Sequence, residues 1–206
     1  MELGTENAGI ARGILKKIRM KRLHIFFIAC LLTAMATSIS GCKQKKKTPP
    51  RPVTFHHLYL YTTQEVSDPQ TQVIRQVPLI ERSIEMADTL SLEAQLNNLL
   101  DTLSATYFNG LKVSAAVVTD SLQSSIAKIY LQEPAGFVMP DSVGNYRSWY
   151  DYFQGSSGGE YTGIVLTETV LQRDYKGAWI RSAEFYYQGK PFGEWDHVLL
   201  TGELKR

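Results

Sequence analysis

The chain has 206 residues, a formal net charge of +2 and two cysteines. The charge is unevenly distributed, because the part after Arg51 contains 11 basic and 18 acidic side chains. That mildly acidic part lacks the basic face that nucleic-acid binding requires, and two cysteines are too few for a disulfide framework. Its length, about 150 residues, is typical of one domain with its own hydrophobic core.

Residues 1–41 are predicted to be a secretory signal peptide. Met20-Lys21-Arg22 supplies a basic start, an apolar run covers 23–35, and small and hydroxyl residues follow. The run is too short to span a bilayer, which needs about 20 residues. Either Met20 is the true initiator, or residues 1–19 form a long basic n-region.

Cys42 carries the strongest functional signal in the sequence. Ile39-Ser40-Gly41-Cys42 resembles the bacterial lipobox, where the cysteine thiol is acylated and the signal peptide is cut just before it. The resemblance implies a lipoprotein, with a covalent lipid such as palmitate chains on Cys42 and no other cofactor. The alternative is an uncleaved apolar anchor with an incidental cysteine.

Residues 42–52 are predicted to be the lipid anchor and a basic, proline-rich tether. The run from Lys43 reads Lys-Gln-Lys-Lys-Lys-Thr-Pro-Pro-Arg-Pro and offers no apolar side chain to bury. Its lysines either contact anionic lipid headgroups, worth about 1 kcal/mol each, or form a solvated spacer.

Residues 53–206 are predicted to form a single α+β domain. Leucines at 92, 96, 99, 100 and 103 form one apolar stripe, which predicts a helix over 91–104 with Ser91 as its N-cap. A second helix is predicted over 161–175, ended by Gly177, with the Gly/Ser-rich run before it as a flexible lead-in. Alternation of β-branched and aromatic residues predicts strands over 53–61, 71–79, 112–119, 125–132, 178–187 and 194–201. The expected fold is a mostly antiparallel β-sheet with two helices packed on one face.

The order of these elements resembles the GerMN domain. A leucine-rich helix leads to the hairpin Lys112-Val113-Ser114-Ala115-Ala116-Val117 and Ile126-Ala127-Lys128-Ile129-Tyr130-Leu131. The Gly/Ser-rich stretch Gly155-Ser156-Ser157-Gly158-Gly159-Glu160, a second helix and a strand closing on Gln188-Gly189-Lys190 then follow. Members of that family are often exported lipoproteins of sporulation and spore germination. The resemblance implies a non-catalytic interaction or assembly module, and supplies no catalytic residues.

An aromatic insert is the candidate binding surface. Tyr146, Trp149, Tyr150 and Phe153 crowd together, with Tyr152 among them. Rings with polar tips are favoured in partner contacts and sugar-binding platforms. The alternative is that the insert folds back and buries its rings against the sheet.

Patterns for catalysis or metal binding are weak. His56 and His57 are adjacent on a predicted strand and therefore point to opposite faces, and His197 has only Glu194 and Asp196 beside it. No metal is expected, because a metal site needs three or four converging ligands. Four carboxylates leave a glycan hydrolase open as an alternative: Asp141, Asp151, Glu160 and Glu168.

The predicted function is a lipid-anchored cell-envelope module that binds protein or peptidoglycan without catalysis. The alternatives are a periplasmic glycan hydrolase and an enzyme-inhibitor lipoprotein, and a homo-oligomer stays open. Lys43 differs from the aspartate that marks inner-membrane retention, and the basic run lacks an acidic surface-export tag. By this analogy the anchor lies in the outer membrane, facing the periplasm.

Overall fold

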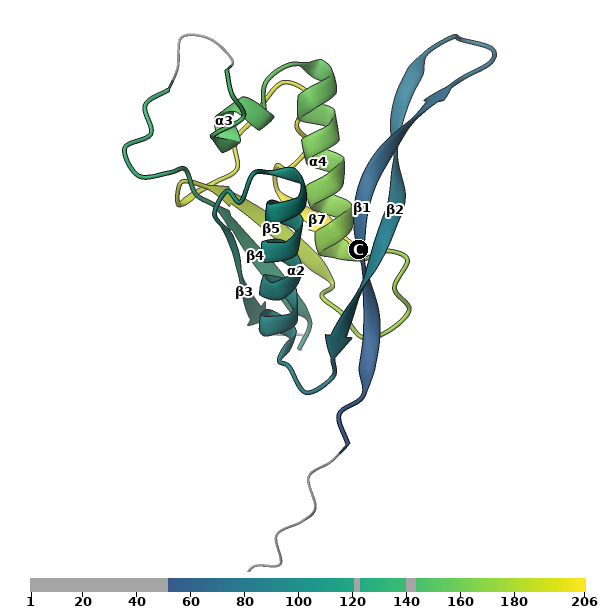
Figure 1. Ribbon diagram of the computed structural model, residues 1–206, viewed down its shortest axis with the longest axis vertical. Coiled ribbons are helices and arrows are strands. Elements are labelled where there is room, and N and C mark those ends of the chain that lie inside the picture. The colour runs from purple at the N-terminus through teal and green to yellow at the C-terminus, as the bar shows by residue number, and fades with distance from the viewer. Residues whose placement is uncertain (1–51, 121–122, 140–143) are drawn as a thin grey trace, which may run out of the picture. The chain divides into compact units, whose positions relative to one another are not determined.

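The computed structural model describes residues 52–120, 123–139 and 144–206, which belong to one compact unit (Figure 1). The predicted signal peptide, Cys42 and the tether as far as Arg51 lie outside the described residues, and so does Asp141. Within these described ranges, no helix has both the length and the apolar character needed to cross a bilayer.

The unit opens with a long antiparallel hairpin of β1 (Phe55–Ser67) and β2 (Ile74–Ala87). Both strands extend further than the predicted 53–61 and 71–79. The tip turn lies at the expected place, because Asp68 Oδ1 accepts from the Gln70 N–H at 2.8 Å and the Asp68 N–H donates to Val73 O. Such a side-chain-closed turn is typical of Asp followed by polar residues.

The base of the hairpin is closed by Asp88, which directly follows β2. Its carboxylate bonds to the Thr54 hydroxyl and to His56 Nδ1, so the start of β1 and the end of β2 are held together. These two partners hold the pKa of Asp88 below its ordinary value. We call this arrangement the Asp88 clamp.

The second sheet contains β3 (Val113–Thr119), β4 (Ser125–Leu131) and β5 (Ser182–Tyr187) in that order. Strands β6 (Lys190–Pro191) and β7 (Glu203–Lys205) both pair with β5. All pairings are antiparallel except β4 with β5, where the chain crosses over through helix α4 (Ser156–Leu171). A β–α–β crossover requires this parallel pairing.

Helices α2 (Leu92–Tyr107) and α4 contact each other and lie over one face of this sheet (Figure 1). The buried hydrophobic residues of β3, β4 and β5 come from the face beneath them: Val113, Ala115, Ala127, Ile129, Leu131, Ala183 and Phe185. The predicted stripe of leucines in α2 fills the same core, and Ser91 caps the helix by accepting from the Ala94 N–H at 3.2 Å. The predicted α+β class is therefore confirmed.

Helix side chains cap the outer edges of two strands. The Asn97 amide of α2 accepts from the Ala115 N–H and donates to Ala115 O in β3, at 2.8 and 2.9 Å. The Gln172 amide accepts from the Tyr59 N–H in β1 at 2.8 Å and donates to Tyr59 O at 2.6 Å. Each amide pairs the N–H and C=O of one edge residue, as a neighbouring strand would, and so blocks strand addition at that residue.

Other predicted boundaries were also wrong. Strand β5 begins at Ser182 and not at the predicted residue 178. Helix α4 begins at Ser156, so the Gly/Ser-rich run forms its first turns and is not a lead-in. The helix ends before Gln172, whose left-handed backbone (φ 50°) and bonds to Tyr59 stop it short of the predicted Gly177. In place of a strand over 194–201 there is a single bridge between Trp195 and Val198, and β7 is the last strand.

Candidate binding groove along helix α4

The aromatic insert forms a one-turn helix, α3 (Trp149–Tyr152), which is held by acceptors at its amino end. Ser148 Oγ accepts from the Asp151 N–H at 3.2 Å. The Glu133 carboxylate accepts from the N–H groups of Trp149 and Tyr150 at 2.9 and 2.8 Å. These are the N–H groups that a helix start leaves unpaired, so Glu133 fixes the insert to the end of β4.

The insert divides into buried and accessible rings. Trp149 is 0% exposed and Phe153 is 1% exposed, so both belong to the core and the prediction that they form a binding surface was wrong. Their spacing of four residues places both rings on one side of the turn, against Phe108 and Phe192. Tyr146 is 49% exposed and Tyr150 is half-buried.

Tyr150 lines a hollow of about 490 Å³ at the amino end of α4, which we call the aromatic hollow. The Tyr150 and Trp195 rings meet edge to face at 5.7 Å between centroids, and Trp195 also packs on Phe153 at 5.1 Å. The remaining lining is almost entirely polar: Gln154, Gly155, Ser156, Glu194, Asp196 and His197. The sequence reasoning missed Trp195, although a tryptophan between two acidic residues was a signal for a partly exposed ring.

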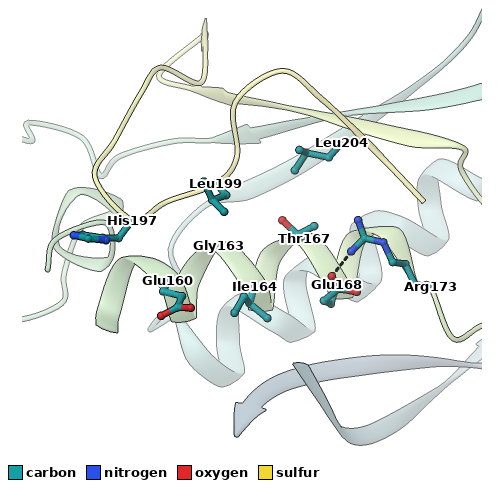
Figure 2. A pocket seen from close by; sticks show the side chains of 9 residues that line it. All are labelled: Glu160, Gly163, Ile164, Thr167, Glu168, Arg173, His197, Leu199 and Leu204. Atoms are coloured by element: carbon teal, nitrogen blue, oxygen red, sulfur yellow. Dashed lines mark hydrogen bonds and ion pairs between the residues drawn. The ribbon is translucent and has the colours of Figure 1, made fainter. Parts of the chain in front are cut away.

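A second hollow, of about 290 Å³, runs along α4, and we call it the α4 groove. Figure 2 shows the C-terminal segment passing over the helix, with His197 at one end of the groove and Arg173 at the other. The lining combines apolar, acidic and basic side chains: Glu160, Gly163, Ile164, Thr167, Glu168, Arg173, His197, Leu199 and Leu204. Because His197 also lines the aromatic hollow, the two hollows are neighbours on one side of α4.

Two helix glycines allow the C-terminal segment to lie this close. A Cβ on Gly159 would be 3.0 Å from Val198 Cγ2 and 3.3 Å from Phe153 O, and one on Gly163 would be 3.4 Å from Leu199 N. Glycine lowers helix propensity, so its presence at both positions is explained by the close backbone approach.

Tyr146 borders a different hollow of about 350 Å³, on the other side of the start of α4. It is lined by Asn109, Tyr146, Tyr152, Gly158, Tyr161 and Thr162. The Asn109 amide donates to Tyr146 O and to the Tyr152 hydroxyl, both at 3.0 Å. The predicted surface residues Tyr146 and Tyr150 therefore do not share one site.

The three described carboxylates of those considered for hydrolysis, Asp151, Glu160 and Glu168, do not converge. Asp151 is buried and accepts from the N–H groups of Gly144 and Arg147, which makes it part of the insert's framework. Glu160 and Glu168 are eight residues apart on α4, or about 12 Å along the axis, more than the roughly 5 to 9.5 Å between glycosidase carboxylates. Glu168 forms an ion pair with Arg173, and its partial burial raises its pKa despite that pair.

The histidines also lie apart. His56 is half-buried, bonds to Asp88 and stacks on Tyr175 at 5.3 Å, whereas His57 is exposed. Across the described ranges, no three His, Cys, Asp or Glu side chains form a group that would hold a metal ion.

Comparisons with protein-family models, with curated proteins and with solved structures found no match to this chain.

Proposed function

We propose that this chain is a lipid-anchored module of the cell envelope that binds peptidoglycan at the aromatic hollow, without catalysis. The observation that supports this most directly is the chemistry of the hollow, where Tyr150 and Trp195 meet beside Glu194, Asp196 and Gln154. Ring faces pack against the C–H faces of sugars, and amide and carboxylate groups bond to sugar hydroxyls and amides.

The size of the hollow agrees with this class of ligand. Its volume of about 490 Å³ is within the range of roughly 300 to 1,000 Å³ in which small ligands bind. The Trp195 ring packs against the rings of Phe153, Phe192 and Tyr187, whose centroids lie 5.1 to 6.2 Å from its own. A ring fixed in this way loses little conformational entropy when a ligand stacks on it.

The proposed anchor supports the choice of peptidoglycan. A lipid on Cys42 followed by the tether of residues 42–52 would allow the domain to move at most about 36 Å from the membrane surface. In the outer membrane, facing the periplasm, the first polymer within that reach is the cell wall. The resemblance to GerMN domains likewise favours a binding or assembly role over a catalytic one.

The test is sedimentation of the full chain with purified peptidoglycan sacculi. We expect Tyr150→Ala and Asp196→Asn each to weaken binding at least tenfold. Tyr146→Ala removes a more exposed tyrosine from another hollow, and we expect this variant to bind sacculi like the unchanged chain. Circular dichroism on all variants checks that they are folded.

Three results would contradict the proposal. The first is that the unchanged chain does not sediment with sacculi. The second is that Tyr146→Ala weakens binding as much as Tyr150→Ala, which would move the site to the other hollow. The third is release of soluble glycan from the sacculi, which would favour the alternative of a hydrolase.

A further inference from the structure

The α4 groove has an apolar floor that no part of the described chain covers. Leu199 is 82% exposed, and it lines the groove together with Ile164 and Leu204. A single exposed leucine is common on protein surfaces. Aliphatic side chains that gather around a hollow are a different feature, because they form an apolar patch that a partner can bury.

The two ends of the groove differ in how far their acidic side chains are paired with basic ones. At the Arg173 end, the guanidinium pairs with Glu168. At the His197 end, Glu160 forms no ion pair among the described residues, and Glu194 and Asp196 lie next to His197 in the sequence and line the adjoining hollow. The His197 end therefore carries the uncompensated negative charge.

We propose that the α4 groove binds an extended peptide segment of a partner protein, with a basic side chain near Glu160 and an aliphatic side chain over Ile164 and Leu199. Glu160 and Ile164 are one helical turn apart, about 6 Å along the axis. Two residues of an extended chain span about 6.6 Å. The segment should therefore have its basic residue two positions from its first aliphatic residue, an alternating pattern.

A peptide fits this groove better than a sugar does. The lining contains no Trp, Tyr or Phe, whereas the aromatic hollow has three such rings. Recognition would depend on side chains, because the lining consists of side chains from α4 and from the C-terminal segment. The inference is independent of the proposed peptidoglycan site, because only His197 is common to both linings.

The experiment measures fluorescence polarisation of two labelled peptides with the full chain. The first probe is acetyl-Lys-Ser-Leu-Ser-Leu-amide, and the second has Glu in place of Lys. We expect the Lys peptide to bind with a dissociation constant below 1 mM and at least tenfold more tightly than the Glu peptide. The preference should shrink as salt rises, because exposed charges are screened.

Two variants and two matched controls locate the binding. Leu199→Asp and Glu160→Lys should each weaken binding of the Lys peptide at least tenfold. Val138→Asp is the control for Leu199→Asp, because Val138 is 81% exposed and does not line the groove. Asp101→Lys is the control for Glu160→Lys, because it reverses an exposed charge on α2. Both controls should bind the Lys peptide within twofold of the unchanged chain. All four positions have exposed side chains, so the variants keep the core intact.

The inference is overturned if the Lys peptide does not bind below 1 mM, if the two peptides bind equally, or if the variants and their controls weaken binding equally. Displacement of the peptide by chitotetraose would also overturn it, because the groove would then belong to a glycan. Sedimentation with sacculi should be unchanged in Leu199→Asp, so failure here is distinguishable from failure of the peptidoglycan site.

Discussion

Trp149 and Phe153 lie in the core, while Tyr146 and Tyr150 reach the surface, although all four come from one short aromatic run. For Trp149 and Tyr150 the difference arises from position on the single turn of α3, whereas Tyr146 precedes the helix with a left-handed backbone (φ 51°). Glu133 and Ser148 fix the rotation of that turn by holding its N–H groups. The same contrast recurs in the first turns of α4, where Gly159 faces the C-terminal segment and Gly158 meets nothing.

The largest expected effect on stability comes from removing a buried ring of the insert. Trp149→Ala should lower the free energy of unfolding by about 3 to 5 kcal/mol, because it leaves a cavity in the core and loses the bond from Trp149 Nε1 to Lys112 O. Tyr146→Ala should change it by no more than about 0.5 kcal/mol. Urea titration followed by circular dichroism measures both. Equal losses would contradict the burial of Trp149 and the exposure of Tyr146.

A smaller effect is expected from the two neighbouring glycines. Gly159→Ala should destabilise the chain by about 1 to 2 kcal/mol, because its Cβ would press on Val198 and on Phe153 O. Gly158→Ala has open space and should stabilise α4 by about 0.5 to 1 kcal/mol. Thermal unfolding of the pair gives opposite signs if the C-terminal segment lies against α4, and the same sign if it does not.

The smallest effect concerns the phenol that supports Glu133. Partial burial raises the pKa of Tyr187 well above its ordinary value, and the Tyr187 hydroxyl bonds to Glu133 Oε1 at 2.6 Å. The stabilisation from a raised pKa is complete below the unfolded-state pKa, about 10 for tyrosine, and is lost as pH rises above it. Unfolding free energies at pH 8 and pH 11 should fall less in Tyr187→Phe than in the unchanged chain. If both chains lose the same unfolding free energy between pH 8 and pH 11, the Tyr187 hydroxyl does not cause the loss.

Elements defined by local patterns could be predicted from the sequence. The leucine stripe and Ser91 located α2, and alternation located β3 and β4 within one residue at each end. The strand expected to close on Gln188-Gly189-Lys190 ends at Tyr187, and Gln188 and Gly189 adopt the positive φ that a tight hairpin requires, whereas Lys190 already belongs to β6.

Features that depend on distant residues could not be predicted. The Gly/Ser-rich run looks like a loop, but Gly159 and Gly163 are needed where residues 198 and 199 pass close to α4. Residues 194–201 have a strand-like composition, but only Trp195 and Val198 form a bridge. Trp195 lines the candidate site because this segment is irregular and not a strand. The predicted site therefore contained Tyr150 but not Trp195.

The Asp88 clamp has a mechanical consequence if Cys42 is anchored as proposed. Tension on the tether would enter the domain at Thr54, while the rest of the fold is connected through the residues after Asp88. In this geometry the force pulls β1 away from β2 at the base of the hairpin, so the strands would separate one residue pair at a time, starting from Phe55 and Ala87. The bonds from Thr54 and His56 to Asp88 lie at that fork and would bear the load first. The force that opens this fork should therefore depend on Asp88 and should fall under acidic conditions that protonate it, whereas further separation must also break the bonds from β1 to Gln172 and Thr169.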